Sequence, residues 1–396
     1  MIYLDNAATS FPKPAGMAEA MMEHMVSWCG NPGRAGHRMS RRTEEAVYNT
    51  RKILADFFKI SDPARILFTH NTTEALNLAI KGTLKPGDHV ITTSMEHNSV
   101  LRPLLEYQPT IIECGKDGSL DISKVTGAIR SNTRMIVCTH ASNVTGTIMP
   151  IKELAGICRR HKLLLLVDAA QSAGHLPVDV EGVELMAVPG HKGLLGPMGT
   201  GILYVKSGLE IVPLIQGGTG TYSKLLDPPV EFPASFEAGT LNAPGLVGLG
   251  YSVRYLMKIG PAEGRIRELT KYLDEMLRNM KNVTVYGPED CRSKVGIVTF
   301  NVAGRDCEEV ASLLDDSFGI AVRSGYHCAG LAHKTIGTWD TGAVRLSVGI
   351  FNSLRQMRAA ADAVYRISKL HQVSSSSSAA PAFAASQSVI SGCRHF

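Results

Sequence analysis

The strongest constraint on the fold is that short apolar runs alternate with helical patterns over the first two thirds of the chain. The apolar runs predict strands at residues 65–69, 89–93, 110–113, 135–139, 163–167, 185–188 and 201–205. Helices are predicted between most of them, at residues 73–81, 99–107, 122–130 and 151–161. Strands that alternate with helices form mostly parallel sheets covered by helices. We therefore expect an α/β fold whose ligands bind beyond the carboxyl ends of the strands.

The pattern changes after about Leu214. Residues 216–241 are rich in Gly, Pro and Ser and predict a long functional loop. Further helices are predicted at 243–259, 262–280, 308–318 and 354–370, and strands at 283–285, 295–302, 320–323 and 343–347. A single core rarely grows beyond ~250–300 residues. We expect a large domain at 13–245, a smaller α+β domain from 1–12 and 246–372, and a flexible low-complexity tail at 373–396.

Composition excludes several classes of function. The net charge of +5 is small and spread along the chain, so nucleic-acid binding is not expected. No apolar run approaches the ~20 residues of a membrane helix, and the first residues lack the pattern of a signal peptide. The eight cysteines form no C-x-x-C pair, so neither a metal site nor a disulfide framework is indicated. We expect a cytoplasmic protein with reduced thiols.

An aspartate and a glycine-flanked lysine each follow a predicted strand. Asp168 ends the run 163–167, and Lys192 comes shortly after the run 185–188. Taken alone, Asp168 is more typical of a helix cap and Lys192 of a solvated loop. Together they match pyridoxal phosphate (PLP), which needs a lysine for its Schiff base and a carboxylate that keeps its ring nitrogen protonated.

Two further features fit this cofactor. Thr72 and Thr73 open the helix predicted at 73–81, where free N–H groups and the helix dipole favour a phosphate. The same threonines are also typical of a simple helix cap. His97 follows the strand at 89–93 and could stack on a pyridine ring, although a lone histidine there is more typical of an ordinary loop.

Beyond these residues, the chain resembles the cysteine desulfurases, which are fold-type I PLP enzymes of the class V aminotransferase family. The resemblance extends from residue 1 to about residue 372 and rests on motifs in the family's order. These motifs lie at residues 3–9, 68–78, 95–99, 142–146, 167–171, 190–192, 236–240 and 323–345.

The resemblance implies roles for residues around the cofactor. Lys192 would form the Schiff base, Asp168 would pair with the ring nitrogen, and His97 would stack on the ring. The contacts to the phenolic oxygen side and to the phosphate would come from Asn143, Gln171, Thr72, Thr73 and His191. Pro189 departs from the family, because many members have serine there, so weaker or rearranged phosphate binding is expected.

The resemblance also implies a subunit arrangement and a substrate site. Thr240 would reach the phosphate of the neighbouring subunit, which implies a homodimer with shared active sites. Arg345 would hold the substrate carboxylate, for which the bidentate guanidinium is suited. Asn143 and Arg323 are assigned to the same substrate site.

Residues 323–331 resemble the desulfurase loop that carries the nucleophilic cysteine, here Cys328. The short distance in sequence from Cys328 to Arg345 resembles the SufS-like group II enzymes. A Cys328 thiolate, favoured by a cation such as Arg323 or His327, would attack the sulfur of PLP-bound cysteine. Lys192 would move the Cα proton. Taken alone, a free cysteine is most often a small buried apolar residue.

These expectations describe a PLP-dependent cysteine desulfurase with Lys192, Cys328 and His97 as its catalytic residues. It would convert L-cysteine to L-alanine and supply persulfide sulfur, through an acceptor protein, for iron–sulfur clusters or thio-cofactors. One alternative is a selenocysteine lyase or a cystine/cysteine C–S lyase, which releases the chalcogen without a protein nucleophile. The other is a non-catalytic PLP-binding partner protein, motivated by Pro189 and by the tail with Cys393.

Overall fold

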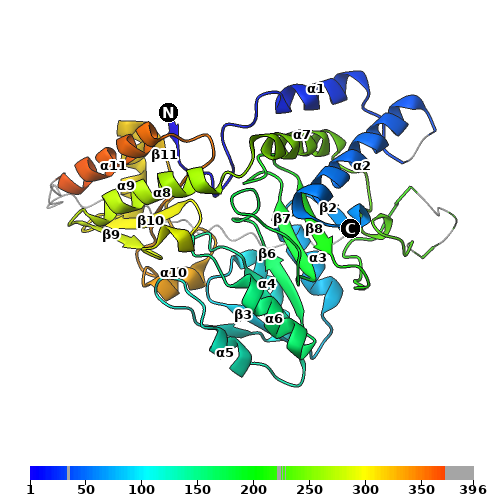
Figure 1. The fold of residues 1–396 in the computed structure, drawn as a ribbon, viewed down its shortest axis with the longest axis horizontal. Helices are drawn as coiled ribbons and strands as arrows, with labels where there is room; N and C mark the ends of the chain where they lie inside the picture. Colours follow the sequence, from blue (N-terminus) through cyan, green and yellow to red (C-terminus); the bar gives the residue numbers. More distant parts are fainter. Residues whose placement is uncertain (34–35, 221–223, 225, 228, 371–396) are drawn as a thin grey trace, which may run out of the picture.

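The structure is a computed structural model that describes residues 1–33, 36–220, 224, 226–227 and 229–370. The tail predicted at 373–396, with Cys393, lies outside the described residues. Figure 1 shows a sheet at the centre of the molecule, with a second, smaller group of strands and helices at one end.

Largely buried strands form the central sheet, in the order β2-β8-β7-β6-β5-β3-β4. Neighbouring strands run parallel, except that β8 is antiparallel to both β2 and β7. The expected α/β fold with a mostly parallel sheet is therefore confirmed. The strands are β2 (Ile66–Thr69), β3 (His89–Thr93), β4 (Thr110–Ile112), β5 (Thr133–Thr139), β6 (Leu164–Asp168), β7 (Leu185–Pro189) and β8 (Gly201–Val205).

Helices cover both faces of this sheet. In β7, Leu185 and Ala187 face one hydrophobic cluster and Met186 and Val188 face another, because successive side chains of a strand point to opposite faces. The first cluster contains residues of α3 (Thr72–Thr83) and α4 (Asn98–Leu104). The second contains residues of α2 (Arg38–Phe58), α6 (Ile151–His161) and α7 (Ala243–Ile259). The remaining helices of this part are α1 (Met17–Ser27) and α5 (Ile122–Gly127).

The smaller group of elements has its own hydrophobic cluster (Figure 1). Its antiparallel sheet has the order β12-β10-β9, and β1 pairs with β11 beside it, so that Leu4 joins this cluster. The strands are β1 (Ile2–Tyr3), β9 (Val283–Tyr286), β10 (Ile297–Val302), β11 (Ile320–Ala321) and β12 (Val344–Ser347). The helices are α8 (Glu263–Arg278), α9 (Cys307–Phe318), α10 (Gly330–Ile336) and α11 (Leu354–Lys369).

The domain boundary predicted between residues 245 and 246 remains a prediction. Leu249, Val253 and Leu256 of α7 pack in the cluster of the large sheet, whereas the cluster of the small sheet takes up residues from Ala262 onward. We propose that α7 belongs with the large domain and that the boundary follows it.

Some elements differ from the sequence-based expectation. Helices α1, α2 and α10 were not predicted, and the helix expected to reach residue 107 ends at Leu104. Pro103 has no N–H to donate within that helix, and a 3-10 turn at Leu105–Tyr107 follows. Among the described residues, none of the helices is both long enough and apolar enough to cross a lipid bilayer.

One buried ion pair ties the segment before α7 to the central sheet. Arg51 of α2 donates from Nη1 to Glu237 Oε1 and from Nη2 to Glu237 Oε2, each over 2.8 Å. The backbone N–H of Phe68 donates to the same carboxylate at 2.7 Å. The Arg51 and Glu237 side chains are only 6% and 7% exposed. Glu237 therefore anchors the chain three residues before Thr240.

The variant Glu237→Ala is expected to lower the free energy of unfolding by about 3–5 kcal/mol, because it leaves the Arg51 guanidinium buried without its carboxylate. Urea denaturation measures this loss. The matched control is Glu106→Ala, which breaks the solvent-exposed pair with Lys81 and should change stability little. If both variants are equally stable, the Arg51–Glu237 pair does not have this anchoring role.

Candidate active site

A cavity lies at the carboxyl ends of β3, β5, β6 and β7, next to the N-terminus of α3. Its lining contains every residue predicted to bind the cofactor except Thr240: Thr72, Thr73, His97, Asn143, Asp168, Gln171, His191 and Lys192. The other lining residues are Asn71, Leu76, Ser99, Thr139 and Ala170. The parallel strands end at one edge of the sheet, and this brings together side chains that are far apart in sequence.

One end of the cavity has polar atoms suited to an anion. Thr72 Oγ1 and His191 Nδ1 are buried, and neither has a hydrogen-bond partner among the described residues. Both belong to the cavity lining, where Thr72 and Thr73 open helix α3. Buried polar atoms are rarely left unpaired, because an unmade hydrogen bond is costly. A phosphate, which accepts hydrogen bonds and favours a helix N-terminus, fits this end of the cavity.

A buried carboxyl group and a buried amine share the same cavity. Asp168 is 3% exposed, and its Oδ1 accepts a hydrogen bond from the Ala170 N–H at 2.9 Å. Burial raises the pKa of Asp168, although the Ala170 N–H and Lys192 both oppose this rise. Burial lowers the pKa of Lys192 to about 8, and Asp168 opposes that change. The Lys192 amine therefore exchanges a proton close to neutral pH.

His97 is held in one orientation at the start of α4. Its Nδ1 accepts a hydrogen bond from the Ser99 N–H at 3.0 Å, so the ring proton lies on Nε2. Burial, followed by the charge of Lys192, lowers the pKa of His97 to about 4. The imidazole is therefore neutral near pH 7. Ser99 Oγ, 2.9 Å from His97 Nδ1, also lies 2.8 Å from Thr73 Oγ1 and so connects the ring to α3.

Cys328 lies outside the lining of this cavity but is joined to it. Its backbone carbonyl accepts a hydrogen bond from the Asn98 N–H at 2.8 Å, and Asn143 Nδ2 donates to the His327 carbonyl at 2.7 Å. Cys328 is exposed, and its Sγ lies 3.5 Å from Arg323 Nη2. The turn of the predicted nucleophile is therefore held by Asn143 of the cavity lining and by Asn98, which lies between the lining residues His97 and Ser99. A guanidinium lies beside its sulfur.

The suggestion that His327 supplies a positive charge is wrong. Burial, together with the charge of Arg345, lowers the pKa of His327 to about 2. Its ring forms a hydrogen bond with His333, in which His327 Nδ1 and His333 Nε2 are 3.0 Å apart, and not with the sulfur of Cys328. Arg323 is the cation that the structure places beside Cys328.

Arg345 lies behind Asn143 and is only 1% exposed. It donates from Nη1 to the Asn143 carbonyl at 3.0 Å and from Nη2 to Asp5 Oδ1 at 2.9 Å. Its Nε is buried and has no partner among the described residues. Two of its five N–H groups are thus in use, and one of the others is available to a further acceptor.

Thr240 is exposed and is not part of the cavity lining. Its predicted partner, the phosphate of a neighbouring subunit, involves a second chain. That role stays a prediction.

Sequence analysis missed several residues of the site. Glu96 is fully buried and accepts hydrogen bonds from Thr93 Oγ1 at 2.6 Å and from the Thr139 N–H at 2.9 Å. It therefore joins the ends of β3 and β5 just before His97. Burial raises the pKa of Glu96 to about 8. The signal for Thr139 was its place at the end of a predicted strand, and the signal for Glu96 was its place next to His97.

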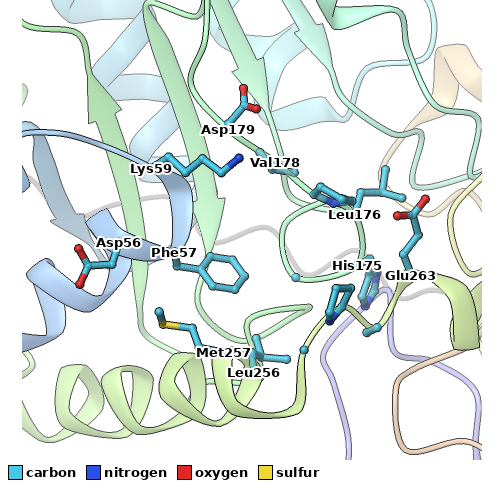
Figure 2. Close-up of a pocket in the computed structure, with 15 residues that line it drawn as sticks. Asp56, Phe57, Lys59, His175, Leu176, Val178, Asp179, Leu256, Met257 and Glu263 are labelled. Carbon is cyan, nitrogen blue, oxygen red and sulfur yellow. The ribbon is translucent and has the colours of Figure 1, made fainter.

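A second cavity of about 350 Å3 lies apart from these residues (Figure 2). Figure 2 shows its side chains coming from the end of α2, from the segment after Gly174 and from α7. None of the predicted site residues lines it, although it is the larger of the two cavities. We place the candidate active site in the smaller cavity, because the titratable residues at the strand ends converge there.

Comparison with known proteins agrees with this geometry. Residues 2–359 match the aminotransferase class-V family. The chain belongs to the class V aminotransferase family. Its enzymes depend on pyridoxal phosphate, and the cavity above contains a lysine, a carboxyl group and an anion site that fit this cofactor.

Named relatives in this family are cysteine desulfurases. A probable cysteine desulfurase of Methanothermobacter thermautotrophicus is 36% identical over 372 residues, which cover 90% of this chain and 92% of the relative. A cysteine desulfurase of Yersinia pestis is 33% identical over 348 residues, which cover 83% and 84% of the two chains.

A solved structure agrees over nearly the whole chain. The apo cysteine desulfurase of Thermococcus onnurineus has a TM-score of 0.86 and 35% identity, with 93% of this chain and 94% of that one covered. The expected fold type and the resemblance to cysteine desulfurases are therefore confirmed.

Lowering the pH from 7.5 to 5.5 is expected to lower the free energy of unfolding. Burial lowers the pKa of His97, His191 and His333 to about 4 and that of His327 to about 2. In the unfolded chain these groups take up protons below about pH 6.5, so the stabilisation present above that pH is lost as the pH falls toward 4.

Urea denaturation at pH 7.5, 6.5 and 5.5 measures this effect. Glu96 and Asp168 act in the opposite direction, because burial raises the pKa of both carboxyl groups. They are outnumbered, because burial also lowers the pKa of His140 and His175 to about 4. Equal or greater stability at pH 5.5 would contradict the neutral, buried state of these histidines.

Proposed function

We propose that this protein is a PLP-dependent cysteine desulfurase that converts L-cysteine to L-alanine and leaves a persulfide on Cys328. The observation that carries this proposal is the attachment of an exposed cysteine to the cofactor cavity. Asn98 and Asn143 hold the backbone of its turn, and Arg323 lies beside its sulfur. PLP, when bound, supplies an electron sink that stabilises negative charge on the substrate carbon.

The cavity residues would hold the cofactor in the following way. Thr72 and His191 would donate to its phosphate, which would satisfy their unpaired atoms. Asp168 would keep the ring nitrogen protonated, and neutral His97 would cover a face of the ring. The side of the phenolic oxygen would be contacted by Asn143 and by Gln171, whose Nε2 donates to the Ala7 carbonyl at 3.1 Å. Because burial lowers its pKa to about 8, Lys192 can take and return a proton at Nζ near neutral pH.

Cys328 would provide the sulfur acceptor. Its thiolate would attack the substrate sulfur, the bond between that sulfur and Cβ would break, and a proton would complete the methyl group of alanine. The sulfur atom would leave as a persulfide on Cys328, so that L-cysteine and one thiol give L-alanine and one persulfide. The sulfur that makes this attack would lie beside the Arg323 guanidinium, whose Nη2 is 3.5 Å from Cys328 Sγ.

Arg345 would hold the carboxylate of the substrate. Its buried, unpaired Nε can donate to an acceptor, and its fixed bonds to Asn143 and Asp5 prevent the guanidinium from reorienting. Preorganised donors lose little entropy when the substrate binds. L-cysteine and L-selenocysteine share this carboxylate.

The proposed assembly is a homodimer with shared active sites. The segment that leads from β8 toward Thr240 exposes apolar side chains at Val212, Leu214 and Ile215. Adjacent exposed apolar side chains are typical of surfaces that pack against another chain. A second copy covering this segment would bring Thr240 close to the phosphate of its neighbour.

The proposed setting is a reducing, cytoplasmic compartment, in which an acceptor protein takes the persulfide sulfur for iron–sulfur clusters or thio-cofactors. The seven cysteines of the described residues are all free thiols, which supports a reducing environment.

The variant Cys328→Ser tests the nucleophile. Wild-type protein with L-cysteine and a reductant is expected to yield equal amounts of alanine and sulfide. The variant should lose this activity by at least about 100-fold, because a serine oxygen is a poor sulfur acceptor. Equal sulfide release by both proteins would instead identify a C–S lyase. A wild type that shows the visible absorbance of bound PLP but makes no alanine would identify a non-catalytic PLP-binding protein.

The variant Arg345→Ala tests the substrate site. The KM for L-cysteine is expected to rise strongly, because a charged contact of roughly 2–4 kcal/mol is lost. Steady-state kinetics measures this rise, and urea denaturation reports any loss of stability from the broken Asp5 bond. The matched control Asp5→Asn keeps the guanidinium and should change KM much less. An unchanged KM in Arg345→Ala would remove this residue from the substrate site.

A further inference from the structure

The turn that carries Cys328 has an uncommon backbone conformation. His327 and Cys328 both adopt left-handed angles, with φ of 51° and 56°. Side chains other than glycine rarely occupy this region, and such residues persist only when the surrounding structure holds them there. Asn98 and Asn143 hold the two carbonyls of this turn from the side of the cavity. A second set of contacts holds the side chain of His327.

Two nearly coplanar histidines, joined edge to edge by a hydrogen bond, and a threonine form this second set. The rings of His327 and His333 lie 5.2 Å apart with an angle of 20° between their planes. His327 Nδ1 is 3.0 Å from His333 Nε2, and His333 Nδ1 is 2.7 Å from Thr338 Oγ1. The other nitrogen of His327, Nε2, lies 3.3 Å from the Arg323 carbonyl. These three side chains belong to residues that are no more than 2% exposed.

These hydrogen bonds form a series from Thr338 through His333 and His327 to the Arg323 carbonyl, and that carbonyl determines the direction of each bond. A carbonyl oxygen can only accept, so His327 Nε2 must carry the proton and donate to the Arg323 carbonyl. His327 Nδ1 is then an acceptor, and His333 Nε2 must donate to it. His333 Nδ1 accepts in turn, and the Thr338 hydroxyl donates to it. The reverse direction would place a lone pair of His327 against the Arg323 carbonyl.

Both histidines must be neutral for this arrangement, since an imidazolium has no acceptor nitrogen. Burial and the charge of Arg345 keep them so, with a pKa of about 2 for His327 and about 4 for His333. The charged groups that act on His327 are Arg345 and Arg323, and the one that acts on His333 is Arg345. Neither histidine therefore takes up a proton near neutral pH.

We propose that His333 and Thr338 are positioning residues that hold His327 through hydrogen bonds of fixed direction and thereby keep Cys328 beside Arg323. This inference rests on the proposed role of Cys328 as the nucleophile. Neither residue is part of the cavity lining. Thr338 acts at the far end of this series of hydrogen bonds, where its hydroxyl donates to His333 Nδ1 and so holds the His333 ring in the orientation from which Nε2 donates to His327.

The matched variants Thr338→Val and Thr338→Ser test this proposal on the holoenzyme. Valine keeps the shape but removes the donor, and serine restores it. In Thr338→Val we expect the rate at which iodoacetamide alkylates Cys328 to change by about fivefold, because its sulfur no longer keeps its place beside Arg323. Peptide mass spectrometry separates Cys328 from Cys29, which is also exposed.

The same variants give a kinetic test. A displaced nucleophile is expected to lower kcat for alanine formation about tenfold. The KM for L-cysteine should stay within about twofold, because the substrate contacts are untouched. Thr338→Ser should match the wild type in both measurements. The pair His333→Leu and His333→Gln repeats the comparison, since the glutamine amide still donates to His327.

Two results would overturn the proposal. In one, Thr338→Val alkylates and turns over like the wild type. In the other, the alkylation rate and kcat change as much in Thr338→Ser as in Thr338→Val, which would mean that the threonine acts through its shape alone. A wild type that makes no alanine would refute the proposed desulfurase activity instead. The alkylation rates would still decide whether the hydrogen bonds position Cys328.

Discussion

The buried guanidinium of Arg345 joins three parts of the chain that are far apart in sequence. It binds Asp5 of the N-terminal segment and the Asn143 carbonyl after β5, and its own strand bridges Arg323. Asn143 then holds the turn of Cys328. A buried charge is stable only when it is paired and hydrogen-bonded, so these segments must meet there in the folded protein. The relation between the cavity and Cys328 depends on this meeting point and on the Asn98 N–H, which donates to the Cys328 carbonyl.

Burial determines the chemistry of the groups around it. The histidines at the cavity and behind Cys328 are kept neutral, and the Lys192 amine holds its proton less tightly than in water. The same effect raises the pKa of the carboxyl groups of Asp168 and Glu96. At neutral pH the positive charges that remain are those of Lys192, Arg323 and Arg345, which suits the proposed binding of a carboxylate and the proposed use of a thiolate.

The sequence predicted a residue's role when the pattern that reveals it lies in neighbouring residues, and failed when the role depends on a partner that no nearby pattern reveals. Asp168 and Lys192 could be found because each follows an apolar strand, and such strands end at one edge of a parallel sheet. Helix α2 was missed because its buried face includes Arg51, whose partner Glu237 lies 186 residues later. His333 and Thr338 gave no signal, because their partner is the ring of His327 rather than a motif. The charge assigned to His327 was wrong for a similar reason, since the sequence does not reveal its burial.

A nucleophile that must serve both a buried cofactor and an external acceptor faces two opposing demands. In the proposed function Cys328 has to be exposed, and exposed turns are usually the least ordered part of a chain. Here the sulfur is exposed while the ring of the preceding residue is buried, so packing can act on His327 and leave Cys328 free. Both positions have left-handed backbone angles, so the turn itself is held in an uncommon conformation. Order at Cys328 is thus supplied by buried contacts of His327 rather than by contacts of the thiol itself.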